Sequence, residues 1–313
     1  MPYSDIVVVG SSNTDMIIKL NHAPRPGETV LGGEFFTAAG GKGANQAVAA
    51  ARFGGRVTFV ARLGRDTLGD QAIARLMNDG IDVSHVSRDP QIASGAALIF
   101  VAKNGENSIA VAPGANGRLS AADVRKARAS IADAKILLLQ LEIPLNAVTL
   151  AADLAFSRGV KVILNPAPAR SLPPSLLRHV SILTPNESEA ELLTGVTVTG
   201  SAAARRAAEK LREMGVETVI LTMGSKGALI VDSDGSRLVH GFKVKAVDTT
   251  AAGDIFNGAL AVSISAGKSI DESVHLANAA AAISVTRLGA QPSAPTRTEI
   301  EVFLKQGRIT RAS

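Results

Sequence analysis

The sequence alternates between short apolar runs and longer stretches with helical periodicity over most of its length. The apolar runs are rich in Val, Ile and Leu and lie at 6–9, 57–61, 136–141, 160–164, 181–183 and 218–221. The helical stretches lie at 44–53, 68–78, 121–130, 145–157, 202–214, 254–266 and 271–286. Near-continuous apolar strands separated by helices are typical of a parallel sheet covered on both faces. The sequence therefore predicts an α/β fold with a mostly parallel central sheet.

Two regions, 14–38 and 95–113, interrupt this alternation. Both alternate apolar and polar residues as half-buried strands do, and the second contains Lys103-Asn104-Gly105, a hairpin turn. We expect them to form a small separate sheet, or lid, over the main one. Because the 313 residues contain no internal repeat or long linker, we predict a single domain, residues 1–313, with this lid.

The composition restricts the class of protein. With 46% hydrophobic residues the chain can bury a sizeable core, and the absence of cysteine excludes disulfides, thiol nucleophiles and cysteine-bound metals. Since no basic leader or apolar span of about 20 residues is present, we expect a soluble, cytoplasmic protein without a membrane partner. The net charge of +5 comes from scattered Lys and Arg, and Trp is absent, so we expect no nucleic acid partner. An anionic small molecule suits this charge equally well.

Polar residues follow several of the predicted strands. Parallel α/β sheets bind their ligands beyond the carboxyl ends of the strands, so such residues are candidates for one shared site. The residues at these positions are Asn13, Asp15, Glu142, Asn165, Asn186 and Thr222. Ordinary loops are also polar, so this pattern alone leaves open whether the residues form a site.

The segment "DTTAAGD" at 248–254 places small residues directly before a predicted helix. The first N–H groups of a helix lack intrahelical partners and attract anions, so this turn can hold a phosphate. Asp254 would repel a phosphate as a ligand, but it suits a general base that takes the proton of an attacking hydroxyl. An ordinary acidic residue at a helix start explains Asp254 equally well. Both interpretations remain open on these residues.

Two other segments carry weaker signals. In "TPNESEAELLTG" at 184–195, Thr184 and Glu187 fit a helix-capping box, which we favour over a magnesium–nucleotide site at Asn186 and Glu189.

The glycine-rich "GGKGANQ" at 40–46 lets backbone approach a ligand, and Lys42 and Asn45 offer donors. It fails as a dinucleotide fingerprint because Gln46 replaces the third glycine. The five histidines are too widely spaced to suggest a zinc site.

Taken together, these segments resemble a known enzyme family. "GGKGANQAVAAARFG" at 40–54 and "DTTAAGDIFNGAL" at 248–260 are similar to the two signatures of the ribokinase, or PfkB-type, family of carbohydrate kinases. "NPAPAR" at 165–170, "TPNESEAELLTG" and "TRLGAQPS" at 286–293 match further segments in the expected order. The resemblance spans about residues 5–305. It implies a three-layer sandwich with a mostly parallel central sheet and a small β-sheet lid.

The resemblance also implies an activity, the ATP-dependent phosphorylation of the 5-hydroxyl of D-ribose to give D-ribose 5-phosphate and ADP. Asp254 matches the catalytic base, and Ala251, Ala252 and Gly253 match the anion hole before it. The positions that match sugar-binding residues are Asn13, Asp15, Gly41, Lys42, Gly43, Ala44, Asn45, Glu142 and Asp254. Those that match nucleotide-binding residues are Asn186, Thr222, Met223, Gly224, Ser225, Lys226, Gly227, Gly253, Asp254 and Asn278.

By the same resemblance, two kinds of metal ion are implied. Asn186 and Glu189 match residues that hold Mg²⁺ through water and the ATP phosphates. A potassium site, held largely by backbone carbonyls, would comprise Asp248, Thr250, Ser284, Arg287, Gly289 and Ser293. An ordinary turn or cap at Asp248 is the alternative. The lid is implied to form the interface of a homodimer.

Several other functions compete with this interpretation. A kinase of the same family for 2-deoxyribose, fructose or pseudouridine is the nearest, because side chains alone do not fix stereochemistry. A catalytically silent sugar- or nucleotide-binding protein is disfavoured by the intact Asp254 and its turn. A dinucleotide oxidoreductase is disfavoured because no glycine fingerprint follows the first strand.

Overall fold

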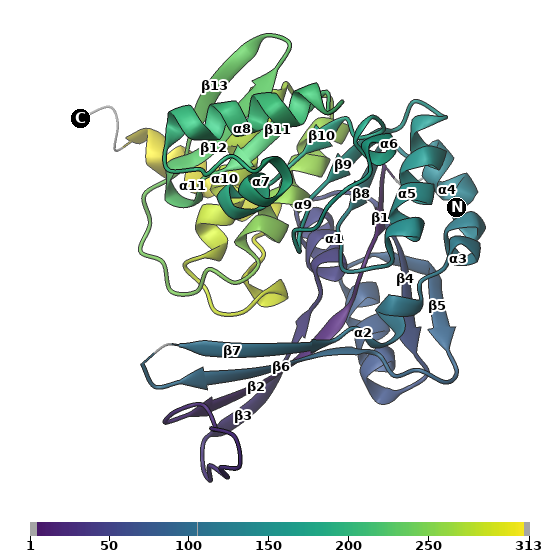
Figure 1. Ribbon diagram of the computed structural model, residues 1–313, viewed down its shortest axis with the longest axis vertical. Helices are drawn as coiled ribbons and strands as arrows, with labels where there is room; N and C mark the ends of the chain where they lie inside the picture. The colour runs from purple at the N-terminus through teal and green to yellow at the C-terminus, as the bar shows by residue number, and fades with distance from the viewer. Residues whose placement is uncertain (1–4, 105, 310–313) are drawn as a thin grey trace.

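The computed structural model describes residues 5–104 and 106–309. Its larger sheet forms the centre of the molecule (Figure 1). The strand order is β13-β12-β11-β10-β9-β8-β1-β4-β5. Their bounds are β1 (Ile6–Val9), β4 (Val57–Gly64), β5 (Asp82–Asp89), β8 (Ile136–Leu139), β9 (Lys161–Leu164), β10 (Ile182–Leu183), β11 (Thr218–Thr222), β12 (Gly227–Asp232) and β13 (Gly235–His240). Pairing is parallel from β5 to β11 and antiparallel in the β12–β13 edge. The expected α/β class is confirmed.

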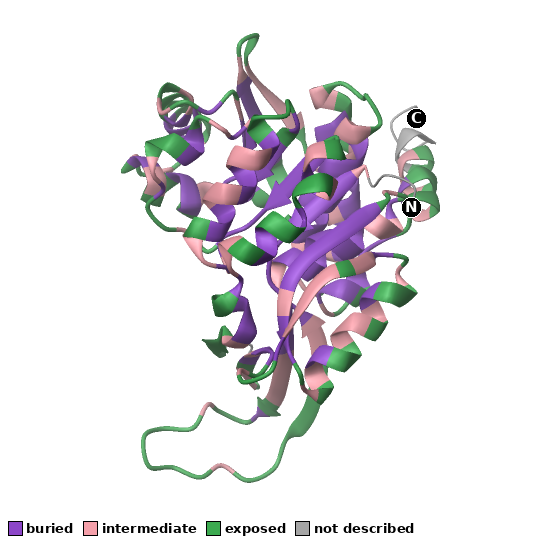
Figure 2. Cartoon of the chain, turned by 90° about the vertical axis from the view of Figure 1, so that its right-hand side faces the viewer, coloured by how far each residue is buried: buried purple, intermediate pink, exposed green. Residues whose placement is uncertain are grey.

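Helices cover both faces of this sheet. They are α1 (Lys42–Arg52), α2 (Thr67–Asn78), α3 (Ala121–Lys126), α4 (Arg128–Asp133), α5 (Leu145–Phe156), α6 (Pro174–Leu177), α7 (Glu187–Thr194), α8 (Ser201–Glu213), α9 (Ala252–Ser265), α10 (Ile270–Ser284) and α11 (Arg297–Ile309). Strand β1 contributes Ile6 and Val8 to a core with α1, α9 and α10, and Val7 to a core with α5 and α8. Figure 2 shows the buried strands between helices whose outer faces are exposed. These are the three layers expected from the sequence.

A glycine lets two of these helices approach closely. A Cβ added at Gly258 of α9 would lie 2.6 Å from the Ala49 Cβ and 2.7 Å from the Gln46 carbonyl oxygen, both in α1. Any larger residue would push the helices apart, since neither obstacle is a flexible side-chain end. The start of α1 is thereby held against the first turn of α9.

The lid is a separate sheet that projects from one end of the molecule (Figure 1). Its strands are β2 (Asn13–Leu20), β3 (Glu34–Gly40), β6 (Gly95–Ala102) and β7 (Asn107–Ala112), in the order β3-β2-β6-β7. The small sheet expected from 14–38 and 95–113 is therefore confirmed, although its first region contains no strand between 21 and 33. Gly105, in the expected hairpin turn, lies outside the described residues.

Other elements differ from the expectation. The stretch 121–130 is not one helix, because α3 ends at Lys126 and α4 begins at Arg128. Strand β5 and the β12–β13 hairpin were not predicted, and β5 reads "DVSHVSRD", without an apolar run. An edge strand has one neighbour and needs fewer apolar residues than a central one. Within the described ranges, no helix is long and apolar enough to cross a bilayer.

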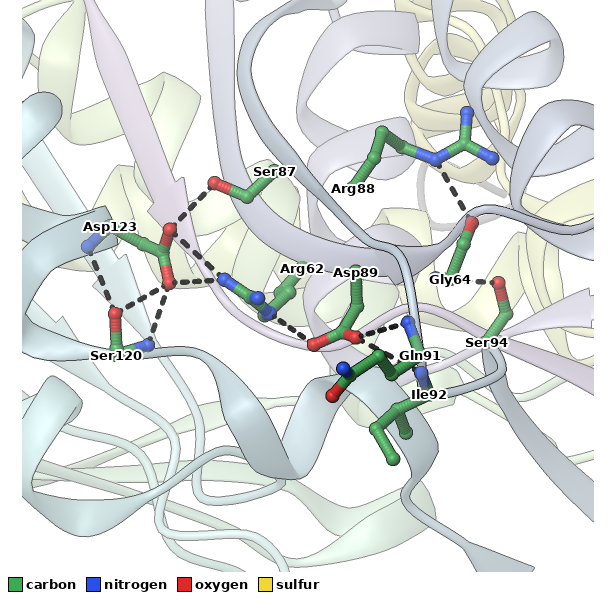
Figure 3. Close-up of polar contacts among 10 residues, drawn as sticks. All are labelled: Arg62, Gly64, Ser87, Arg88, Asp89, Gln91, Ile92, Ser94, Ser120 and Asp123. Carbon is green, nitrogen blue, oxygen red and sulfur yellow. Dashed lines mark hydrogen bonds and ion pairs between the residues drawn. The ribbon is translucent and has the colours of Figure 1, made fainter.

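A network of ion pairs fixes the segment that enters the lid (Figure 3). Arg62 of β4 pairs with Asp89, at 2.9 Å, and with Asp123, at 3.1 Å. Asp89 also accepts hydrogen bonds from the N–H groups of Gln91 and Ile92, at 2.9 and 3.0 Å. These two bonds and Arg62 lower the pKa of Asp89 to about 2. The carboxylate therefore stays charged, and it holds the loop after β5 in one conformation.

Candidate active site

The candidate site lies where the central strands end and α9 begins. A cavity of about 660 Å³ opens there, lined by residues from β11, α7, α9 and α10 and by the loop 241–246. Of the residues expected to bind a nucleotide, those that line it are Asn186, Thr222, Gly224, Ser225, Gly227, Gly253, Asp254 and Asn278. Met223 and Lys226 are not among the lining residues, and Met223 is buried in the core. The sequence motifs thus converge on one cavity.

Asp254, in the first turn of α9, is 5% exposed and lines this cavity. Its two carboxylate oxygens each accept a hydrogen bond from α1. Asn45 Nδ2 donates to Oδ2 at 3.0 Å, and Gln46 Nε2 donates to Oδ1 at 2.9 Å. The close packing of α1 on α9 thus fixes both donors on the carboxylate.

Burial raises the pKa of Asp254. The charge of Lys42 and the hydrogen bonds from Asn45 and Gln46 lower it, while Glu142 raises it further, and the pKa ends above its usual value. A carboxylate with a raised pKa is a stronger base, and it still ionises if enough donors face it. Asp254 therefore has the chemistry of a general base beside a cavity.

The residues before Asp254 form the start of α9. Ala251 has φ 60°, a left-handed conformation that costs an L-residue about 1–2 kcal/mol. This turn brings Ala251, Ala252 and Gly253 to the wall of the cavity, and a Cβ added at Gly253 would meet nothing within 4 Å. The first-turn N–H groups and the helix dipole are thus combined with open space, which suits an anionic group.

A group of polar and charged residues adjoins the cavity through Lys42, which lines it. We call Asn13, Asp15, Lys42 and Glu142 the polar cluster. The backbone N–H of Lys42 donates to Glu142 Oε2 at 3.0 Å. Burial and the charge of Glu142 raise the pKa of Asp15 to about 6. Burial lowers the pKa of Lys42, but the charges of Asp254, Glu142 and Glu189 outweigh it and raise the pKa. The Lys42 ammonium therefore lies in the field of carboxylates from both the cavity and the polar cluster.

The remaining residues expected on the sugar side occupy the turn into α1. Gly41 has φ 88°, and a Cβ there would lie 2.6 Å from the backbone nitrogen of Asn13. Gly43 packs against Gly10 and Ser11, and the Ala44 N–H donates to the Ser11 carbonyl at 2.8 Å. In this structure Gly43 and Ala44 thus hold the turn against the end of β1.

Sequence reasoning missed Gln46, Gln140 and Asn116 as polar residues around the site, whereas Asn165 was expected there because it follows a predicted strand. Gln46 Nε2 also contacts Asn165 Oδ1 at 3.1 Å, and Gln140 Nε2 donates to Gln46 Oε1 at 2.6 Å. Asn116 Nδ2 donates to Asn13 Oδ1 at 2.7 Å. Gln46 and Asn165 lie inside the motifs "GGKGANQ" and "NPAPAR", which gave a signal. Asn116 lies in neither.

The capping box of α7 is formed by other residues than Thr184 and Glu187. Asn186 is the cap, its Oδ1 accepts from the Glu189 N–H at 2.8 Å, and Glu189 Oε2 accepts from the Asn186 N–H at 2.9 Å. Thr184 instead donates to Asn257 Oδ1 at 2.7 Å.

Asn186 and Glu189 thus cap the helix and line the cavity at the same time. Burial is the main cause of a raised Glu189 pKa. Within residues 5–104 and 106–309, no three His, Cys, Asp or Glu residues are grouped so that they could hold a metal ion.

The residues expected at a potassium site join two loops. Asp248 Oδ1 accepts from the Thr250 N–H at 2.9 Å, and Oδ2 accepts from the Gly289 N–H at 2.8 Å. Burial raises the pKa of Asp248, but these hydrogen bonds outweigh it, so the pKa is lowered. The Ser284 carbonyl accepts from the Arg287 backbone N–H at 3.0 Å. Ser293, a few residues further along the chain, is buried. Asp248 is therefore an ionised link between the loop before α9 and the loop after α10.

Known proteins resemble this chain over nearly its whole length. Residues 4–297 match the model of the pfkB family of carbohydrate kinases. The chain belongs to this family. The ribokinase of Haemophilus influenzae is 48% identical, over 96% of this chain and 98% of that protein. The deoxyribokinase of Salmonella typhi is 39% identical over 96% of this chain and 98% of its own length.

Structural comparison agrees with the sequence. The ribokinase of Arabidopsis thaliana, complexed with ribose and ATP, superposes with a TM-score of 0.90 at 34% identity and covers 97% of this chain and 99% of that one. The family resemblance and the fold expected from the sequence are thus confirmed, and the chain is a carbohydrate kinase of the pfkB family.

The hydrogen bonds to Asp254 predict a pH effect. Gln46→Leu removes a donor that lowers the pKa of Asp254, so that pKa should rise. A general base acts in its ionised form, so we expect activity to fall as the pH drops through this pKa, and the fall should begin at higher pH in the variant. The measurement is the acid limb of the pH profile of kcat/KM.

Gln140→Leu is the matched control, because it alters the same buried network but leaves both donors on Asp254. Its acid limb should stay at the wild-type position. An unmoved limb in Gln46→Leu, or an equal movement in both variants, would contradict the role of Gln46.

Proposed function

We propose that this kinase transfers the γ-phosphoryl group of ATP to the 5-hydroxyl of D-ribose. The observation that carries the proposal is the position of Asp254, a buried carboxylate at the start of α9 between the cavity and the polar cluster. The similarity to ribokinases, 48% identity in the case of Haemophilus influenzae, supports ribose as the sugar.

In the proposed reaction the nucleotide occupies the cavity and the sugar lies on the polar cluster. Asp254 accepts the proton of the 5-hydroxyl, the hydroxyl oxygen bonds to the γ-phosphorus, and the bond from that phosphorus to the bridging oxygen of ADP breaks. The N–H groups at the start of α9 stabilise the charge on the transferring phosphoryl group. Lys42, in the field of Asp254 and Glu142, adds positive charge between the two substrates.

Residues of the cavity wall would hold the nucleotide. Polar groups come from Asn186 at the cap of α7, Thr222 at the end of β11, Gly224, Ser225 and Gly227 in the turn after it, and Asn278 of α10. We assign Met223 and Lys226 to the same segment as residues that shape its turn, since the Lys226 N–H donates to the Met223 carbonyl.

Two metal ions form part of the proposal. Glu189 is a carboxylate on the cavity wall, which suits Mg²⁺ bound mainly by ATP oxygens and water, with Asn186 and Glu189 beyond them. Mg²⁺ would neutralise phosphate charge when it is bound.

For K⁺, the ionised Asp248 and the carbonyl groups of its loops are hard oxygen donors beside the start of α9. Thr250, Ser284, Arg287, Gly289 and Ser293 would complete this site. K⁺ bound there would fix the shape of the turn that holds the phosphate.

A kinase for 2-deoxyribose is the second candidate, because the Salmonella typhi relative is a deoxyribokinase. The polar cluster favours a sugar with more hydroxyl groups, since its charged groups would otherwise stay unpaired.

We also propose that residues 1–313 act as one domain. The absence of cysteine suits a location in the cytoplasm, which we propose for this kinase.

Substrate preference tests the proposed function. ADP release should be measured with ATP, Mg²⁺ and K⁺ across ribose, 2-deoxyribose, fructose and pseudouridine. We expect kcat/KM for ribose to exceed that for 2-deoxyribose by about 100-fold or more, because a site built for a hydroxyl rejects its absence. In the control Asp254→Asn the rate with ribose should fall about 10²–10⁴-fold while the fold is retained. A clear preference for 2-deoxyribose would refute ribose as the substrate.

Exchange of the monovalent cation tests the potassium site. Replacing K⁺ with tetramethylammonium should lower kcat, because the large ion cannot enter the loops around Asp248. In Asp248→Asn, which removes the charge but keeps an acceptor for the Thr250 N–H, the rate should respond less to the exchange. Equal rates of the wild-type protein in both salts would remove this site from the proposal.

The lid would form the interface of a homodimer. Cross-strand pairing places Phe36, Ile109 and Val111 on the lid face that carries Asp15, and all three are exposed. An apolar patch on an exposed sheet is a common site of association.

We expect Ile109→Glu to convert a dimer into a monomer in sedimentation velocity. Leu98→Glu, on the opposite face of the same sheet, is the matched control and should remain a dimer. A monomeric wild-type protein would contradict the proposed interface.

A further inference from the structure

Asn116 is a buried residue at the end of the lid, and its side chain binds the start of the lid. It lies in the short helical turn Gly114–Arg118, directly after β7, and is 1% exposed. Its Oδ1 accepts from the Ser12 N–H at 2.9 Å, and its Nδ2 donates to the Ser12 carbonyl at 3.0 Å. The two backbone groups of Ser12 thereby fix which end of the carboxamide is oxygen and which is nitrogen.

This orientation determines the orientation of Asn13. Asn116 Nδ2 also donates to Asn13 Oδ1, at 2.7 Å. If the Asn13 carboxamide were reversed, two NH₂ groups would face each other. Asn13 therefore directs its own Nδ2 away from Asn116, and among the described residues no group accepts a hydrogen bond from it.

Asn13 and Asp15 lie on the same face of β2, since side chains alternate along a strand. Glycines make room for them. A Cβ at Gly95 would lie 2.2 Å from both Asn116 Nδ2 and Asn13 Oδ1, and one at Gly40 would lie 2.5 Å from the Asp15 carboxylate oxygens. The face thus presents a donor from Asn13 and an acceptor from Asp15, next to each other.

We infer that Asn116 is a positioning residue that makes Asn13 a hydrogen-bond donor to a sugar hydroxyl, with Asp15 as the acceptor beside it. The inference rests on the proposed function, in which the sugar lies on the polar cluster. A hydroxyl group can accept from Asn13 and donate to Asp15 at once, whereas a hydrogen in its place does neither. Asn116 thereby contributes to the selection of a hydroxyl-rich sugar without touching it.

The hydrogen bond between Asn116 and Asn13 also connects the proposed sugar side to the segments that enter and leave the lid. The Ala115 N–H donates to the Ala93 carbonyl at 2.8 Å, so the segments that enter and leave the lid are joined beside Asn116. Ser94 is bound separately. Its Oγ accepts from the Gly64 N–H at 3.1 Å (Figure 3) and donates to Asp66 at 2.7 Å. Ser94 therefore offers a way to loosen the lid base without altering the Asn116–Asn13 pair.

The test is Asn116→Asp, which keeps the size of the side chain and the acceptor for the Ser12 N–H. The variant replaces the donor by an oxygen, so Asn13 should turn its NH₂ group toward the new carboxylate and its oxygen toward the sugar. We expect the KM for ribose to rise by about tenfold or more, the loss of roughly one hydrogen bond, with an unchanged KM for ATP. Protonation restores the donor, so the ratio of variant to wild-type KM for ribose should fall at lower pH.

Asn13→Asp is a second variant that guards against failure of the first to fold. Asn116 Nδ2 can still donate to the new carboxylate, but an acceptor now faces the sugar, so the KM for ribose should rise as well. Ser94→Ala is the control and should leave the KM for ribose close to the wild-type value.

The outcomes separate the inference from the proposed function. An unchanged KM for ribose in both Asn variants, or an equal rise in Ser94→Ala, would overturn the inference while wild-type turnover of ribose upholds the proposed function. A wild-type protein that phosphorylates none of the sugars would overturn both.

Discussion

The arrangement of this molecule depends on keeping one carboxylate, that of Asp254, charged inside the protein. Burial disfavours the charge, and Lys42 and the two amide donors of α1 offset part of this penalty. Those donors reach Asp254 only because Gly258 lets α1 and α9 pack closely. The sheet order places these two helices on the same face, so the fold and the helix packing together determine the surroundings of the Asp254 carboxylate.

The sequence predicted features whose signal is local. Apolar strands such as 136–139 and the small residues before Asp254 can be recognised within a few residues. The partners of Asp254 in α1 could not be recognised in this way, because they lie more than 200 residues away in the chain. Their place in the site follows from tertiary packing, and the family resemblance supplied only Asn45 in advance.

The capping box of α7 shows why local patterns can mislead. The pairs Thr184–Glu187 and Asn186–Glu189 both have the spacing of a box, and they overlap in the chain. The structure selects the second pair because Thr184 is buried and bonded to Asn257 of α9. The choice also brings Glu189 to the cavity, so a contact from a distant helix influences which residues line it. Edge elements such as β5 were missed for a related reason, since their half-exposed sequences resemble loops.

Three of the four lid strands begin or end at the polar cluster, since Asn13 opens β2, Gly40 closes β3 and Gly95 opens β6. The lid is therefore not an independent module placed over a finished pocket. A chimaera that received the lid of a relative would also receive that relative's version of Asn13 and Asp15. Exchange of this sheet between kinases would thus change both the exposed lid face and the polar cluster in a single event, so the two could not be altered independently.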